Sequence, residues 1–193
     1  MANEGPFHVD RLLEVTVEMP AEDWKKMRYE HHDLFGLITA REPGQPRPNP
    51  YNYYKGNVTI DKVTFKNVGL RKKGLLGSVN AQRPSIKINF NKFGVEQEFE
   101  GVSLMTLNNN DTDASHVKQH LSYGLFRKAG IPAPRCNFAR VTVNGEYLGL
   151  YLDFQYGWLS PPGDSDVTTL HVMPTARGVF DLGGVLAFGG VGL

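Results

Sequence analysis

The sequence predicts an α+β fold, in which an antiparallel sheet packs against one main helix. Apolar and polar residues alternate along most of the stretch from Lys55 to Asn108 and again from Asn137 to Leu152, which is typical of half-buried strands. The stretch from Ala114 to Gly130 instead places apolar residues four apart, as in an amphipathic helix. The 193 residues suit one domain with additions and are 40% apolar and 21% charged, as in ordinary globular proteins.

An N-terminal strand and helix precede this sheet. Residues 11–19, RLLEVTVEM, alternate as a strand does. Residues 20–30 begin with Pro20, carry acidic residues first and basic residues later, and so predict a short helix. Four prolines between Arg41 and Tyr54 predict a linker. We therefore expect an N-terminal strand-helix and linker region at residues 1–50.

The main sheet is expected between residues 51 and 153. Two strands meet near Asp61, a third is RPSIKINFNKF, and a fourth is GVSLMTLN. The helix follows over residues 114–129 and ends at Gly130. The last two strands flank Asn144-Gly145, a dipeptide that strongly favours a two-residue hairpin turn.

Residues 154–193 form a tail of different composition. From Gly157 onward there are eight glycines and three prolines, no lysine, and a single arginine. Interior glycines weaken helices and strands by roughly 0.5–1 kcal/mol each relative to alanine. We expect an irregular, glycine-rich tail.

Overall composition excludes several classes of protein. The net charge of +1 gives no reason to expect binding to nucleic acid or to an anionic membrane. No apolar run approaches the roughly 20 residues of a membrane-spanning helix, and the first ten residues do not form a signal peptide. The single cysteine, Cys136, excludes an internal disulfide framework.

The polar stretch LNNNDTDAS, residues 107–115, is expected to be a turn that caps the following helix. A calcium-binding loop counted from Asp111 would need glycine at the sixth position and glutamate at the twelfth, where His116 and Ser122 stand. Asn and Asp favour turns instead, and Asp113 or Ser115 is placed to accept from the N–H groups at the helix start.

Other candidate sites are weak. His116 and His120 have the spacing of zinc ligands, but Val117 replaces the glutamate of the metalloprotease motif, so we predict no metal site. GLLGSVN lacks the pattern of a nucleophilic serine, and Cys136 is expected to be a small buried residue.

Basic residues gather on the second and third strands of the main sheet, with Gly74 and Gly77 in their connection. On the third strand Ser85, Lys87 and Asn89 share one face, and Ile86 and Ile88 take the other. A lysine on a sheet below a glycine-bearing hairpin suits phosphate binding. A solvated basic strand remains the alternative.

With these residues the sequence resembles the CotH family, the spore-coat-protein-H-type atypical kinases. LLEVTVEMPAEDWKKM resembles the opening strand and helix of the family, and NVTIDKVTFKNVGLRKKG its strand pair. RPSIKINFNKF resembles its lysine-bearing strand, and the stretch from FEGVSLMTL to NGEYLGLYL its most recognisable part. The resemblance covers roughly residues 12–152.

The resemblance implies a protein-kinase-like N-lobe at residues 51–153 that binds ATP and Mg²⁺. It places Lys87 against the phosphates and the hairpin from Gly74 to Ser78 over them. It makes the helix at residues 114–129 the one that holds Lys87, through Gln119, where the family is expected to have an acidic residue. The predicted ATP-binding residues are therefore Arg71, Gly74, Gly77, Ser78, Lys87 and Gln119.

The implied function is transfer of phosphate from ATP to Ser or Thr of a spore-coat or cell-envelope protein. Kinase chemistry needs an Asp base and metal-binding Asp and Asn residues from a C-lobe, and none of the aspartates after Leu152 fits such a pattern. We therefore expect a truncated kinase fragment with no identifiable catalytic residue. The alternative is a non-catalytic structural or binding protein of a coat or envelope. Self-association through an uncovered apolar surface is also expected.

Overall fold

The protein is described here from a computed structural model, which describes residues 7–8, 11–31, 51–74, 80–94, 96–131, 133–154, 179–181 and 186–188. Seven strands form a closed barrel, in the order β1-β2-β3-β4-β5-β7-β6. The strands are β1 Leu12–Glu18, β2 Tyr54–Ile60, β3 Val63–Lys73, β4 Ser85–Asn89, β5 Leu104–Asn108, β6 Cys136–Val143 and β7 Glu146–Phe154. A separate pair, β8 Val179–Asp181 and β9 Leu186–Phe188, lies in the predicted tail.

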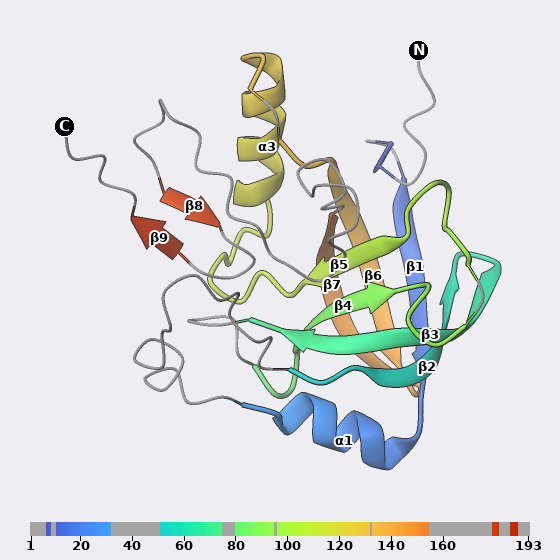
Figure 1. The fold of residues 1–193 in the computed structure, drawn as a ribbon. Coiled ribbons are helices and arrows are strands. Elements are labelled where there is room, and N and C mark those ends of the chain that lie inside the picture. The colour runs from blue at the N-terminus through green and yellow to red at the C-terminus, as the bar shows by residue number, and fades with distance from the viewer. Residues whose placement is uncertain are drawn as a thin grey trace, which may run out of the picture.

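The prediction of a kinase-like N-lobe, in which an antiparallel sheet packs against one main helix, is wrong. Strand β1 runs parallel to β6, from the Leu12 and Phe138 pair to the Val17 and Val143 pair, while its other edge pairs antiparallel with β2. Because β5 also pairs with β7, every strand of the barrel has two neighbours and the sheet closes on itself (Figure 1). Over the described residues the fold is therefore a mixed β-barrel with two short helices, α1 Ala21–Tyr29 and α3 Lys118–Lys128.

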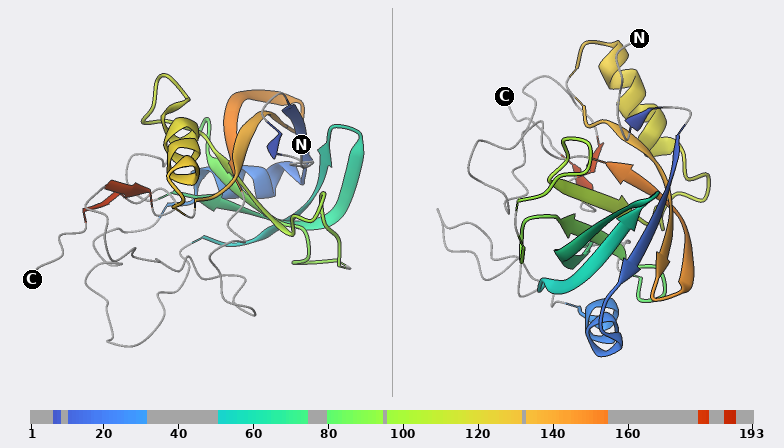
Figure 2. Two further views of the ribbon diagram at one scale, coloured as in Figure 1. Left: turned by 90° about the horizontal axis from the view of Figure 1, so that it is seen from above. Right: turned by 90° about the vertical axis from the view of Figure 1, so that its right-hand side faces the viewer.

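The interior of the barrel is the apolar core. The predicted alternation is seen directly on β4, where Ile86 and Ile88 are fully buried in the core while Lys87 faces the opposite side. Figure 2 shows the strands wrapping around this interior. The other strands contribute core residues of the same kind: Leu13, Val15, Val17, Val58, Ile60, Leu70, Met105, Leu107, Ala139, Val141 and Tyr151.

The local predictions for the N-terminal strand, its helix and the last hairpin are confirmed. Asn144 and Gly145 both have positive φ, 49° and 83°, as the hairpin turn between β6 and β7 requires. The Asn144 side chain also accepts a bond from the N–H of Met19 at 2.9 Å, which joins this turn to the end of β1. Helix α1 adds Trp24 and Met27 to the core. The linker and most of the tail lie outside the described residues.

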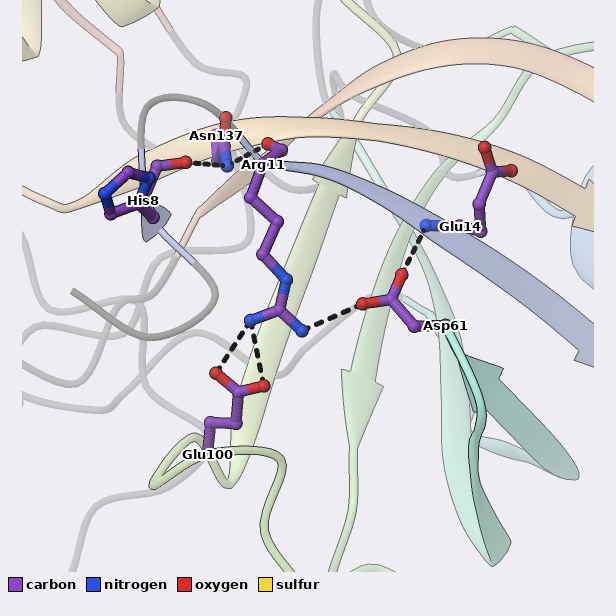
Figure 3. Close-up of polar contacts among 6 residues, drawn as sticks. All are labelled: His8, Arg11, Glu14, Asp61, Glu100 and Asn137. Atoms are coloured by element: carbon purple, nitrogen blue, oxygen red, sulfur yellow. Dashed lines mark hydrogen bonds and ion pairs between the residues drawn. The ribbon is translucent and has the colours of Figure 1, made fainter. Parts of the chain in front are cut away.

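Polar contacts fasten the other end of β1 (Figure 3). The guanidinium of Arg11 bonds Asp61, in the turn between β2 and β3, at 2.8 Å and Glu100, in the turn before β5, at 2.9 Å. The Asn137 side chain donates to the backbone oxygens of His8 and Arg11. Burial alone would raise the pKa of Asp61, but the Glu14 N–H and Arg11 outweigh it and lower that pKa. Both ends of β1 are thus bonded to side chains from turns and a strand that lie far away in the sequence.

Candidate functional site

The predicted lysine lies on the outer face of the barrel, within a row of polar residues. Lys87 on β4 stands between Arg71 on β3 and Thr106 on β5, all three in register. The exposed fractions of these side chains are only 7%, 5% and 1%. Two residues further along β3, Lys73 pairs with Ser85 of β4. We call Arg71, Lys73, Ser85, Lys87, Thr106 and Asn108 the polar strip.

Arg71 is a nearly buried cation. Its guanidinium lies 4.7 Å from the centre of the Tyr53 ring, and within the described part of the chain it makes no hydrogen bond or ion pair. A guanidinium offers five N–H donors in a planar fork that matches the oxygens of phosphate or carboxylate. The nitrogen atoms of Arg71 are not among the buried atoms that lack a partner, so the fork reaches the surface and is placed to meet an anionic ligand.

Gln119 joins helix α3 to the polar strip. Its Oε1 accepts from Nδ2 of Asn108 at 2.7 Å, and its Nε2 donates to the Tyr123 hydroxyl at 2.8 Å. Asn108 in turn lies 3.4 Å from the hydroxyl of Ser85. The structure therefore brings Gln119 to the strip two positions along β5 from Thr106. That it holds Lys87 directly stays a prediction.

The predicted phosphate-covering hairpin is described only at its start. Gly74 follows β3 with a φ of 135°, a conformation that favours glycine, and its backbone oxygen accepts from the buried Tyr51 hydroxyl at 2.8 Å. Gly77 and Ser78 lie outside the described residues. The role of this hairpin in ATP binding stays a prediction.

The predicted turn and helix cap is confirmed over residues 109–115, whereas Leu107 and Asn108 are the last residues of β5. Oδ2 of Asp113 accepts from the N–H of Lys118, the first residue of α3, at 2.8 Å, and Oδ1 accepts from the N–H of Ser115. The bond from the Ser115 hydroxyl and these N–H groups outweigh partial desolvation and lower the pKa of Asp113 to about 2. Residues 114–117 belong to this turn, so α3 begins four residues later than predicted.

Cys136 and the His116–His120 pair are the other candidates for chemistry that the sequence offered. The buried thiol of Cys136 lies 3.5 Å from Nδ1 of His120, and burial raises its pKa to about 11, which keeps the thiol protonated at neutral pH. Across the described ranges no group of three or more His, Cys, Asp or Glu side chains is arranged to hold a metal ion. Within those ranges, no helix is long and apolar enough to span a membrane.

Arg83 has a role that the sequence pattern did not show. Its Nη2 donates to the backbone oxygen of Leu150 at 3.0 Å and lies 3.4 Å from that of Asn109, while the Asn109 side chain donates to the Arg83 oxygen at 2.6 Å. A side chain at Gly149 would meet the Arg83 guanidinium at 3.4 Å. Arg83 therefore joins β7 to the segment after β5.

Asp153 is a candidate functional residue whose burial the sequence analysis did not predict. It pairs in register with Leu107 and Asn137, is fully buried, and neither carboxylate oxygen has a hydrogen-bond partner in the described part of the chain. Burial raises its pKa well above the ordinary value of 3.8. The sequence carries a signal for this burial, because alternate residues of a strand share one face and Asp153 therefore lies on the same face of β7 as the core residue Tyr151.

Comparison with known proteins identifies the family to which this chain belongs. The family model described as CotH kinase protein matches residues 55–156, more than half of the chain. The chain therefore belongs to the CotH family.

A curated relative agrees with this assignment. The chain is 29% identical over 75 residues to the inner spore coat protein H-like protein of Bacillus subtilis (strain 168). The matched stretch covers 39% of this chain and only 23% of that relative. The chain therefore corresponds to about a quarter of the length of this relative.

We expect the Asp113→Asn variant to unfold α3 at a lower temperature than the wild type at pH 7. Because folding lowers the pKa of Asp113, its contribution is present above the ordinary value of 3.8 and is lost as the pH falls toward about 2. Thermal melts by circular dichroism from pH 2 to 7 measure this, with the exposed Glu98→Gln as the control. Equal melting of both variants across this range would contradict the assigned cap.

We expect the Asp153→Asn variant to be more stable than the wild type at pH 8, by about 1–3 kcal/mol, because folding at that pH makes the wild type either bury an ionised carboxylate or take up a proton, whereas Asn does neither and keeps the shape. Folding raises the pKa of Asp153, so its favourable contribution is complete below 3.8 and is lost as the pH rises through the folded-state pKa. The gain should therefore vanish near pH 3.5. Urea unfolding at both pH values measures it, and a pH-independent difference would refute the explanation.

Proposed function

We propose that this chain supplies the ATP-phosphate-binding part of a CotH-type kinase, which transfers phosphate to Ser or Thr of a spore-coat or envelope protein. The observation that carries the proposal is the pair of nearly buried cations, Arg71 and Lys87, directly opposite each other on β3 and β4. Family membership supports it, because the family model carries the description CotH kinase protein.

The polar strip supplies binding and orientation. Lys87 acts as a point charge toward phosphate oxygens, and the planar fork of Arg71 donates two parallel N–H bonds, with its orientation fixed against Tyr53. Thr106 and Ser85 add hydroxyl groups beside them. Holding the phosphates in one geometry is a large part of what a phosphoryl-transfer site does, because positioning and charge stabilisation dominate that chemistry.

Across the described residues no group of three or more His, Cys, Asp or Glu side chains is arranged to hold a metal ion, and Mg²⁺ at nucleotide sites is commonly held by one or two carboxylates together with the phosphates. We derive no step through it and treat Mg·ATP as the ligand. We likewise assign no described residue the role of catalytic base. The proposal for this chain is thus phosphate binding, and turnover depends on groups beyond the polar strip.

Calorimetric titration with Mg·ATP tests the proposal. We expect the wild type to bind and Lys87→Ala to bind about 10- to 100-fold more weakly, since a hydrogen bond to a charged group is worth about 1.5–3 kcal/mol. The matched control is Lys55→Ala, which removes an exposed lysine from β2. Absence of binding in the wild type, or equal affinity in all three proteins, would refute phosphate binding at Lys87.

A non-catalytic role in assembly is the second candidate, and helix α3 favours it. None of its eleven residues is buried, and Leu121 and Leu125 are 63% and 66% exposed. Val117 continues this apolar stripe one turn earlier. The relative in Bacillus subtilis is named as an inner spore coat protein H-like protein, and a coat protein needs surfaces through which it assembles.

We expect the wild type to self-associate with rising concentration and the double variant Leu121→Ser, Leu125→Ser to remain monomeric. Lys118, Arg127 and Lys128 make α3 basic, so added salt should strengthen association by screening their repulsion. Multi-angle light scattering at low and high salt measures both effects. A wild type that stays monomeric throughout would eliminate self-association through α3.

A further inference from the structure

Arg28, the last basic residue of α1, bonds the turn that precedes β4. Its Nε donates to the backbone oxygen of Ala81 at 2.8 Å, and its Nη2 donates to that of Gln82 at 3.1 Å. Its Nη1 pairs with Glu146 at 3.0 Å. The side chain is only 15% exposed, and its guanidinium lies 5.0 Å from the centre of the Trp24 ring. The orientation of the guanidinium is thus fixed on several sides.

The turn held by Arg28 leads directly into the strand of Lys87. Oδ1 of Asn80 accepts from the N–H groups of Gln82 and Arg83, both at 2.9 Å, and so closes the turn. Arg83 is itself bonded to the backbone of β7. Strand β4 begins two residues after Arg83. The position of Lys87 across the sheet therefore depends on where this turn is anchored.

The backbone of Arg28 bonds β3, which bears the other cation of the polar strip. Nζ of Lys72 donates to the backbone oxygens of Arg28 at 2.7 Å and of Glu30 at 2.9 Å. Lys72 is 1% exposed and follows Arg71 directly along the strand. A cation is favoured there because the carbonyl groups at a helix C-terminus carry partial negative charge.

Arg28 thus links β3, which bears Arg71, to the turn that leads into β4, which bears Lys87. We propose that Arg28 is a positioning residue for phosphate binding: its backbone holds β3, its guanidinium holds the turn before β4, and together they set the spacing between Arg71 and Lys87. The proposal rests on the proposed function. It adds α1, which lies before the stretch matched by the family model, to the parts of the chain that shape the site.

The planar fork is what this role requires. Lysine at position 28 keeps the charge and the bond from the backbone, but a single ammonium cannot reproduce two parallel bonds to adjacent carbonyl groups together with the ion pair. Arg28→Lys therefore loosens the turn while leaving the Lys72 contact in place. The matched control is Glu146→Gln, which weakens the ion pair of the same guanidinium and spares both carbonyl bonds.

The experiment combines amide hydrogen exchange with Mg·ATP titration of the wild type, Arg28→Lys and Glu146→Gln. In Arg28→Lys we expect the amides of Gln82 and Arg83 to exchange about tenfold faster and the affinity for Mg·ATP to fall about tenfold. In Glu146→Gln we expect both to match the wild type. Thermal melting of all three proteins shows whether global stability has changed alongside.

Each failure has its own pattern. Unchanged exchange at Gln82 and Arg83 in Arg28→Lys overturns the anchoring, and faster exchange with unchanged affinity overturns its role in binding. An equal loss of affinity in Glu146→Gln assigns the effect to the ion pair and also overturns the proposal. If the wild type binds no Mg·ATP, the proposed function fails, and the role of Arg28 in phosphate binding fails with it.

Discussion

The parallel pairing of β1 with β6 is the constraint on which the rest of the structure depends. It connects strands that lie more than a hundred residues apart in the sequence and turns an open sheet into a closed barrel. Closure separates an apolar interior from an outer face and leaves no unpaired barrel edge. The family match begins at residue 55, so it omits β1, although β1 pairs with both β2 and β6.

Closure also determines how the charged groups are buried. Lys72, on the inner side of β3, bonds carbonyl groups at the end of α1, whereas Arg71 and Lys87 face outward into the polar strip. Asp153 faces the interior with no described bond to either oxygen. A charge that cannot reach water costs stability unless a partner offsets it. Lys72 bonds two carbonyl oxygens, whereas Arg71 contacts the Tyr53 ring and forms no hydrogen bond within the described part of the chain, which is why we propose the polar strip as the ligand-binding surface.

Sequence reasoning succeeded where the determining contacts are local. The hairpin at Asn144-Gly145 follows from backbone preferences of two residues, and the cap by Asp113 spans only five positions. The phosphate-binding candidate Lys87 was placed on the correct face of its strand by alternation alone. The barrel itself was missed, because nothing near Val15 indicates that it pairs with Val141. The bonds of Arg28 likewise span more than fifty residues, and no local pattern indicates them.

The position of β1 also has a consequence for biosynthesis. This strand is synthesised more than a hundred residues before its partner β6, which is completed only at Val143. Until then, the apolar side of β1 is not enclosed by the barrel. Pairing between β1 and β6 also closes a loop of more than a hundred residues, which slows its formation. One edge of β1 therefore stays unpaired while more than a hundred further residues are made, although β2 can already pair with the other edge, and such an open strand edge favours aggregation.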